Sequence, residues 1–171
     1  MVSMKRLLRL FKHRWLDEAD ARRALGAPAL KQLQERVAAS ERLHSGEIRL
    51  CIEASLPLSY LWRNASARER AVTMFGKLRV WDTEHNNGVL IYLLLAEHAI
   101  EVVADRGLNR VVDAAQWRAL TDGMATAFQA GRYEAGLDAA VDAVGALLTQ
   151  HFGVEGHVAN PNELPDAPVV Q

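Results

Sequence analysis

Hydrophobic residues recur along the chain with two different spacings, which separate predicted strands from predicted helices. Residues 47–54, EIRLCIEA, alternate apolar and polar side chains, the pattern of a strand with one better-covered face. Residues 88–96, GVLIYLLLA, are apolar at nearly every position, which is typical of a central strand covered on both faces. Residues 99–105 predict a third strand. The chain therefore contains the strands of a small β-sheet.

Apolar residues with helical spacing occupy most of the remaining chain. Helix-start signals accompany them: Ser66 with Glu69 and Asp113 with Gln116 each form a capping box, and Pro28 suits a first helical turn. The helices predicted in this way cover residues 4–16, 17–25, 28–44, 66–81, 113–130 and 133–151.

The order of these elements predicts the topology of the sheet. Strand, helix and strand in residues 47–96 form a β-α-β unit, whose crossover makes the two strands parallel. Only two residues separate the second strand from the third, so these strands form an antiparallel hairpin. A tight turn would pair Ala96 with Ala99 and bring residues 87–88 beside residues 106–107. The predicted fold is an α/β protein with a small mixed sheet and helices on both faces.

The length of 171 residues suits one domain and is too short for two ordinary ones. We expect residues 17–152 to form that domain, preceded by a basic amphipathic helix in residues 1–16. Residues 153–171 combine three prolines with acidic and other polar residues, so we expect a flexible or loosely docked tail.

Composition and charge exclude several functional classes. The formal net charge is −1, whereas a nucleic-acid-binding protein normally has a basic excess, so we expect no nucleic-acid partner. The single cysteine, Cys51, excludes an internal disulfide framework. The longest apolar run, residues 89–96, is far shorter than the roughly 18 to 20 residues of a transmembrane helix. Arg9 and Lys12 interrupt a start that resembles a signal peptide, so we expect a cytoplasmic protein.

The predicted N-terminal helix is both amphipathic and strongly basic. Residues 1–16 contain five cations and no acid, and the apolar residues with helical spacing are Met4, Leu7, Leu8, Phe11 and Trp15. Two interpretations stay open: the helix packs on the domain or on a second copy, or it contacts an anionic membrane surface. The second would place the protein at the periphery of the inner membrane. The residues assigned to membrane or partner contact are Lys5, Arg6, Arg9, Phe11, Lys12 and Trp15.

A cluster of polar side chains precedes the second strand, in the segment WDTEHNNG at residues 81–88. The hairpin brings a further carboxylate to the same edge of the sheet. Carboxylate and amide oxygens suit hard cations, so the cluster predicts a Ca²⁺ or Mg²⁺ site. The expected ligands are Asn87, Asp105 and Asp113, with Asp82 and Glu84 as further candidates. A structural alternative stays open, because Asn-Asn-Gly favours a turn and Asp113 suits a helix N-cap.

Established catalytic motifs are missing from the sequence. It contains no glycine-rich phosphate loop, no phosphocysteine loop and no pair of aspartates that would supply a phosphatase nucleophile. Glu97 and His98, at the opposite edge of the sheet, form either an acid–base pair or a solvated turn. Tyr60 and Trp62 either anchor a partner or pack over the sheet edge. Catalytic residues therefore stay unassigned.

Three segments together resemble the TPM domain family. They are SGEIRLCIEAS at residues 45–55, NNGVLIYLLLAEHAIEVVADRGL at residues 86–108 and FQAGRYEAGLDAAVDAVGALLTQHF at residues 128–152, and the resemblance extends over residues 33–152. It implies an α/β/α sandwich with a loop-borne acidic site that binds divalent cations in some relatives. Weak phosphatase activity is attributed to several relatives, and others act through partners at membranes without evident catalysis.

The sequence departs from this family at the acidic site. Asn87, Gly88, Asp105, Gly107 and Asp113 match the family pattern. Many relatives, however, have Gly-x-Gly-Leu after the third strand, followed by an acid, and then an aspartate seven residues past the second glycine. Here Arg106 precedes a single glycine, Asn109 replaces the acid, and Asp113 comes one residue earlier. These departures imply a weakened or lost cation site, with Arg106 placed to meet an anion.

Two functions follow from these observations. The first is a non-enzymatic binding or accessory module near the cytoplasmic face of a membrane, acting on a protein partner that is itself membrane-bound. The second is a divalent-cation-dependent, acid-phosphatase-like hydrolase of low activity. The basic N-terminal helix and the missing catalytic motifs favour the first.

Overall fold

The computed structural model describes residues 4–154 and 161–171. In that part of the chain the helices are α1 (Met4–Arg14), α2 (Glu18–Ala24), α3 (Ala27–Glu41), α4 (Leu58–Trp62), α5 (Ala67–Lys77), α6 (Arg106–Asn109), α7 (Ala114–Gln129) and α8 (Tyr133–Phe152). The strands are β1 (Ile48–Glu53), β2 (Val89–Leu94), β3 (Ala99–Ala104) and β4 (Val169–Val170), with a 3₁₀ helix, η1 (Leu95–Glu97), between β2 and β3.

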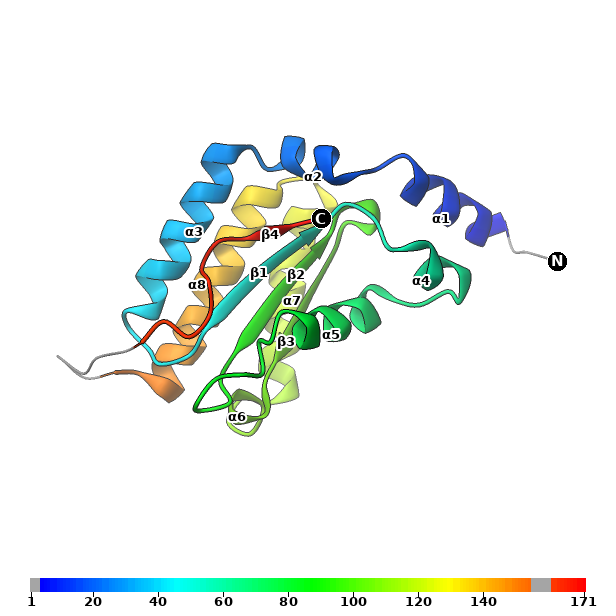
Figure 1. Cartoon of the computed structure of the whole chain (residues 1–171). Helices are drawn as coiled ribbons and strands as arrows, with labels where there is room; N and C mark the ends of the chain where they lie inside the picture. Colours follow the sequence, from blue (N-terminus) through cyan, green and yellow to red (C-terminus); the bar gives the residue numbers. More distant parts are fainter. Residues whose placement is uncertain (1–3, 155–160) are drawn as a thin grey trace.

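The strands form one mixed sheet in the order β3-β2-β1-β4 (Figure 1). Strands β1 and β2 are parallel, with Ile48 opposite Val89, and β2 and β3 are antiparallel, with Val89 opposite Ala104. The predicted β-α-β unit and hairpin are therefore confirmed. The fourth strand, β4, pairs in parallel with the outer edge of β1 and was not predicted.

The hairpin differs from its prediction in one respect. Leu94, and not Ala96, pairs with Ala99, because residues 95–97 form η1 and His98 adopts a left-handed backbone with a φ of 50°. The register is therefore displaced by two residues. Since side chains alternate with a period of two, this displacement leaves every side chain on its predicted face.

Helices cover both faces of the sheet (Figure 1), as expected for an α/β/α sandwich. Helices α2, α3, α7 and α8 cover one face and form the larger core, which includes Leu50, Ile91 and Phe128. Helix α5 covers the other face and forms the smaller core with Leu90 and Tyr92. All six residues of β2 are buried, as its apolar sequence predicts for a central strand.

Two short helices and one helix end were not foreseen. Helices α4 and α6 have five and four residues, too short to produce a detectable apolar period. Helix α5 ends at Lys77 rather than near residue 81, and Arg79 in the following turn has a positive φ of 55°.

The end of the chain is docked rather than flexible over residues 161–171. Leu164 is buried, β4 pairs with β1, and the backbone of Gln171 exchanges hydrogen bonds with Ile52 and Ala54. The composition of the tail concealed this because its few apolar residues occur singly or in pairs, yet Leu164, Val169 and Val170 pack against the two cores. Residues 155–160 of the expected tail lie outside the described residues.

Candidate functional site

Asn87 lies at the amino end of β2 and is buried. Its backbone N–H donates to Thr83 Oγ1 at 3.1 Å, and its side-chain amide donates to Ser45 Oγ at 3.2 Å. The remaining side-chain oxygen, Oδ1, is buried and accepts no hydrogen bond from the described residues. Asn87 therefore tethers two turns and still has an unused acceptor.

Asp105 lies at the same edge, and its backbone N–H donates to Gly88 O at 2.9 Å. Its Oδ1 accepts from the backbone N–H of Arg106 at 2.6 Å and caps α6, whereas Oδ2 is buried without a hydrogen-bond partner among the described residues. The Arg106 guanidinium turns to Asn86 and donates to Oδ1 at 2.8 and 2.9 Å. This arginine therefore braces the turn before β2.

The other three expected ligands do not join this pair. Asp113 caps α7, and its Oδ1 accepts from the backbone N–H groups of Ala115 and Gln116 at 2.8 Å. Asp82 and Glu84 are exposed. Within residues 4–154 and 161–171, no three His, Cys, Asp or Glu side chains are grouped so that they could hold a metal ion.

The opposite edge of the sheet is covered by α1. Arg9 Nε donates to Glu97 Oε1 at 2.6 Å, and the imidazole Nε2 of the buried His13 lies 3.0 Å from the same oxygen. The other ring nitrogen of His13 accepts from the backbone N–H of Leu56 at 3.0 Å. Hydrogen bonds from His13 and Arg9 hold the pKa of Glu97 below its usual range. Glu97 is thus a docking residue for α1, and not half of an acid–base pair with His98.

The outward face of α1 is apolar. The exposed apolar side chains of α1 are Met4, Leu7, Leu8 and Phe11, which are 72%, 42%, 63% and 60% exposed, and Trp15, directly after the helix, is 81% exposed. Lys12 and Arg14 are exposed on the same helix, whereas Arg9 faces the domain and bonds to Asn64 and Ala65 on the α4 side. Arg9, which the sequence assigned to a membrane or partner contact, thus makes its hydrogen bonds within the domain. The side chains of Lys5 and Arg6 lie outside the described part of the chain.

Helix α4 lies beside α1 (Figure 1) and carries two large exposed apolar side chains. Leu58 is 75% exposed and Trp62 is 78% exposed. The hydrogen bonds from α1 to Leu56, Asn64 and Ala65 hold the two helices next to each other. Tyr60, by contrast, turns inward and donates to Thr73 Oγ1 at 2.8 Å. Of the two aromatic residues of α4, only Trp62 is therefore exposed as a partner anchor requires.

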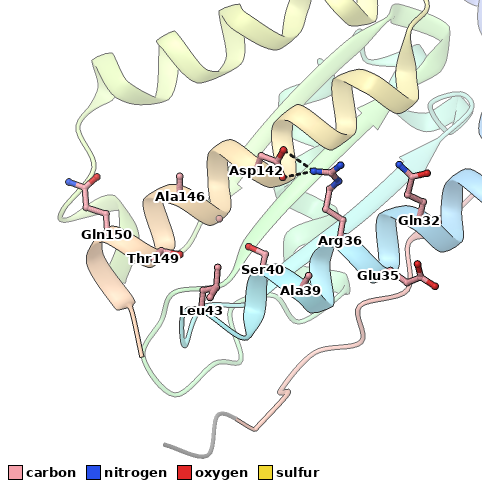
Figure 2. Close-up of a pocket in the computed structure, with 11 residues that line it drawn as sticks. Gln32, Glu35, Arg36, Ala39, Ser40, Leu43, Asp142, Ala146, Thr149 and Gln150 are labelled. Atoms are coloured by element: carbon pink, nitrogen blue, oxygen red, sulfur yellow. Dashed lines mark hydrogen bonds and ion pairs between the residues drawn. The ribbon is translucent and has the colours of Figure 1, made fainter. Parts of the chain in front are cut away.

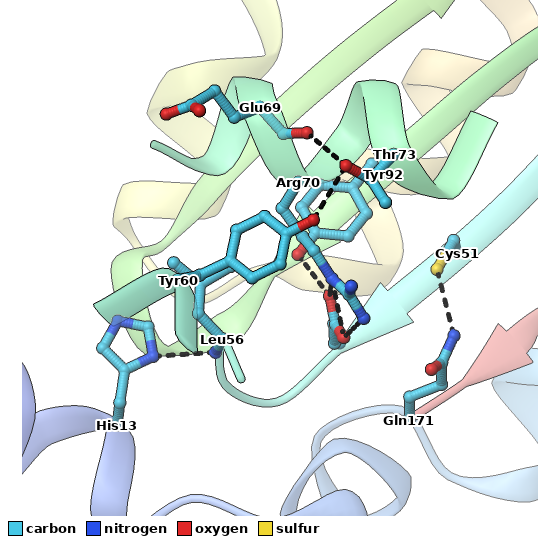
Figure 3. A network of polar contacts seen from close by, with 10 residues as sticks. His13, Cys51, Leu56, Tyr60, Glu69, Arg70, Thr73, Tyr92 and Gln171 are labelled. Atoms are coloured by element: carbon cyan, nitrogen blue, oxygen red, sulfur yellow. Dashed lines mark hydrogen bonds and ion pairs between the residues drawn. The ribbon is translucent and has the colours of Figure 1, made fainter. Parts of the chain in front are cut away.

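A buried polar network lies beneath α5 (Figure 3). Arg70 Nε donates to Glu53 Oε2 at 2.9 Å, and the Tyr92 hydroxyl donates to the same oxygen at 2.6 Å. The Glu53 hydrogen bond raises the pKa of Arg70, and burial raises that of Tyr92. Burial also raises the pKa of the neighbouring Cys51 thiol to about 12, which makes it a poor nucleophile. Sequence reasoning missed this network, although Arg70 occupies the buried stripe of α5 with Ala67, Ala71 and Met74.

A second group of buried charges lies at the amino end of β1. Glu41 Oε1 accepts from the backbone N–H of Ile48 at 2.7 Å, and burial raises the pKa of Glu41 to about 9. Burial also raises the pKa of Glu47 and lowers that of Arg49. Sequence reasoning missed this group, because the alternating pattern of residues 47–54 placed Arg49 on the less covered face of the strand, whereas all six residues of β1 are buried.

A groove of about 910 Å³ runs between α3 and α8 (Figure 2). Its small residues include Ala39, Gly145 and Ala146. Arg36 spans it and donates to both carboxylate oxygens of Asp142 at 2.8 Å. The charges of this pair are matched. Ser40 also lines the groove, and its Oγ lies 2.9 Å from Nε2 of His44, whose Nδ1 lies 2.9 Å from Gly46 O. The groove therefore contains a hydroxyl group beside an imidazole base.

The fold and these sites define an α/β/α sandwich with a mixed sheet, a polar amino edge and a helix-covered carboxyl edge. The family model of the TPM domain matches residues 19–147. The chain therefore belongs to the TPM domain family. Its structure is similar to the NMR structure of the BA42 protein from the psychrophilic bacterium Bizionia argentinensis, with a TM-score of 0.74 and 26% sequence identity over 85% of this chain and 94% of that one. No curated protein matches the chain.

Proposed function

We propose that this protein is a non-enzymatic binding module that is recruited to an anionic membrane surface by α1 and acts there on a protein partner. A location at the cytoplasmic face of the inner membrane follows from this proposal. In the described part of the chain, no helix is long and apolar enough to cross a membrane. Attachment would therefore be peripheral.

The arrangement of α1 carries the proposal. A helix that only completes the fold would turn its apolar residues inward, but α1 docks through Arg9, Leu10 and His13 and leaves Phe11 and Trp15 exposed. Large aromatic side chains beside cations, in a segment without acidic residues, are suited to the interface of an anionic bilayer. The apolar side chains would insert into the bilayer interface, and the cations would be attracted to the anionic lipid headgroups.

Co-sedimentation with vesicles tests this proposal. We expect the full chain to bind vesicles containing anionic phospholipid more strongly than vesicles of phosphatidylcholine alone, with binding that declines as salt increases. Replacing Phe11 and Trp15 with serine should reduce binding at least tenfold, because two large apolar side chains leave the interface. The matched control is Trp81→Ser, since Trp81 is half exposed and lies outside α1 and α4.

Two results would reject a membrane role. One is the absence of any preference of the wild-type protein for anionic vesicles. The other is equal loss of binding in the Trp81→Ser control, which would indicate general adhesion of exposed tryptophans. Capture of a protein partner without vesicle binding would move the function of α1 from the lipid surface to that partner.

A second candidate function is divalent-cation binding at the amino edge of the sheet, with phosphatase-like hydrolysis as the activity it would support. Two oxygens favour it: Asn87 Oδ1 and Asp105 Oδ2 are both buried without a hydrogen-bond partner among the described residues. A hard cation needs about six to eight oxygens, so backbone carbonyls and water would supply most ligands. Asp113 fits less well, because its carboxylate already caps α7.

Titration with Ca²⁺ and Mg²⁺, followed by amide NMR shifts, tests this second function. Saturable shifts confined to residues 86–88 and 105–107, and lost in Asp105→Asn, would support it. Asp82→Asn is the control, because Asp82 is exposed outside this pair. The absence of shifts at millimolar metal would remove the basis for phosphatase assays.

A further inference from the structure

Residues 161–171, named here the strap, lie along the outer edge of β1. Cys51 and Ile52 of β1 pair in parallel with the two residues of β4. The backbone N–H of Gln171 donates to Ile52 O at 2.9 Å, and the backbone N–H of Ala54 donates to Gln171 O at 2.8 Å. The strap therefore adds a strand to an edge that would otherwise leave its hydrogen-bonding groups unpaired.

Two charged side chains bind the backbone of the strap: Glu47, directly before β1, and Arg49, within β1. Glu47 accepts the backbone N–H groups of residues 163–164, each at 3.1 Å. Arg49 donates from one guanidinium nitrogen to Pro165 O and, at 2.8 Å, to Ala167 O. Backbone groups are common to every extended peptide, so these contacts select an extended conformation more than a particular sequence.

Apolar anchors supply the side-chain part of the contact. Leu164 is buried in the smaller core, and Val169 packs against the same core. Val170 packs against the larger core on the other side of the sheet. This arrangement, with main-chain pairing for affinity and pockets for alternate side chains, is the arrangement used in recognition by strand addition.

The strap is an imperfect occupant of this edge. Arg49 is 9% exposed, and its Nε is buried without a hydrogen-bond partner among the described residues. The strap also brings Glu163 and Asp166 beside Glu47, adding to the effect of burial in raising the pKa of that carboxyl group. Like charges at a contact oppose binding. The covalent link to the domain offsets this cost, because a tethered segment has an effective concentration on the order of millimolar.

We propose that the β1 edge is a peptide-binding groove that the strap occupies in the free protein. Its partner is an extended segment of another protein that runs parallel to β1. This segment has apolar residues at the positions of Leu164 and Val169 and has no acids at the positions of Glu163 and Asp166. The groove is separate from the exposed face of α1 and does not depend on membrane binding.

Fluorescence anisotropy with two labelled peptides tests the groove. One peptide has the sequence of residues 161–171, and the other has the same sequence with Glu163→Gln and Asp166→Asn. They are titrated with the full-length wild-type chain and with full-length Leu164→Asp, which weakens the strap in place. Leu58→Asp is the matched control, because Leu58 is 75% exposed and lies away from β1. Circular dichroism melting shows whether each variant is folded.

The Leu164→Asp protein should bind the neutral peptide at least tenfold more tightly than the wild-type or Leu58→Asp protein. The neutral peptide should bind at least threefold more tightly than the acidic one, and adding Arg49→Met should weaken both. The proposal is overturned if the folded Leu164→Asp protein binds neither peptide. It is also overturned if adding Arg49→Met to Leu164→Asp leaves the affinity for both peptides unchanged. A wild-type dimer on size-exclusion chromatography that either peptide dissociates also overturns it, because the occupant would then be a second copy's strap.

Discussion

Replacing Glu41 with glutamine should flatten the dependence of folding stability on pH between pH 7 and pH 8. Glu41 is buried at the carboxyl end of α3, and burial, together with the neighbouring Glu47 and Asp166, raises its pKa from the usual 4.5 to about 9. The folded protein therefore holds a proton on this carboxyl group at neutral pH, whereas the unfolded chain does not. Glutamine keeps the oxygen that accepts from Ile48 and removes the titration.

The sign and size of the effect follow from proton linkage. A group whose pKa is raised in the folded state loses stability as pH rises through the interval between the two pKa values, here from about 4.5 to about 9. One proton corresponds to about 1.4 kcal/mol per pH unit. The wild-type protein should thus lose about 1.4 kcal/mol of unfolding free energy relative to Glu41→Gln between pH 7 and pH 8. For a chain of this size, that loss is a decrease in Tm of roughly 3 to 6 °C.

Urea unfolding of both proteins at pH 7.0, 7.5 and 8.0 measures this difference. The pKa of the buried His44 is lowered by burial, so its effect on stability has the opposite sign but falls largely below pH 7. The pKa of Glu47 is raised in both proteins, and its effect largely cancels in the comparison. Glu35→Gln, on the solvent side of the same helix, is the matched control. Parallel curves for wild type and Glu41→Gln would show that the folded protein keeps Glu41 ionised and would refute the reasoning.

Three further substitutions test how the domain is held together. Glu97→Gln should speed amide hydrogen exchange in α1 at least tenfold while leaving α8 unchanged, because it weakens the charged contacts that dock α1; equal protection of α1 would contradict this. Gly88→Ala should destabilise the protein by roughly 2 kcal/mol or more in urea unfolding, because its Cβ would overlap a backbone carbonyl, whereas Gly76→Ala, with open space around it, should not. Arg70→Met should lower the free energy of unfolding by about 3 to 5 kcal/mol, because it leaves the buried carboxylate of Glu53 without its cation. Adding Glu53→Leu should recover much of that loss. If it does not, the loss comes from the packing of the Arg70 side chain and not from the unpaired charge.

The sequence predicted the sheet well because period and apolarity determine which residues can be buried. The uninterrupted run at residues 89–94 has to be a central strand, and the capping boxes at Ser66 and Asp113 fixed two helix starts. The predicted hairpin register was wrong by two residues. The register depends on the left-handed backbone conformation of His98, and the pattern of apolar and polar side chains does not indicate that conformation.

The candidate sites were harder to predict, because they depend on contacts between residues distant in sequence. Asn87 and Asp105 were placed correctly at one edge, since that followed from the strand order. The docking of Arg9 and His13 on Glu97 joins residues 84 or more positions apart, and no local spacing encodes it. The strap was missed for the same reason. Its composition is that of a flexible tail, whereas its docking depends on contacts with Arg49, which is more than 100 residues away in the sequence.

The position of α1 changes which edge of this domain can bind a ligand. In open α/β sheets, ligands usually bind beyond the carboxyl ends of the parallel strands. Here that edge is closed, because His13 accepts from the backbone of Leu56 after β1 and contacts Glu97 after β2. A ligand can reach it only if α1 leaves, and leaving would break the ion pair between Arg9 and Glu97. In the proposed recruitment to a membrane, an α1 that stays docked would keep this edge closed and would leave the amino edge and β1 to face the proposed partner.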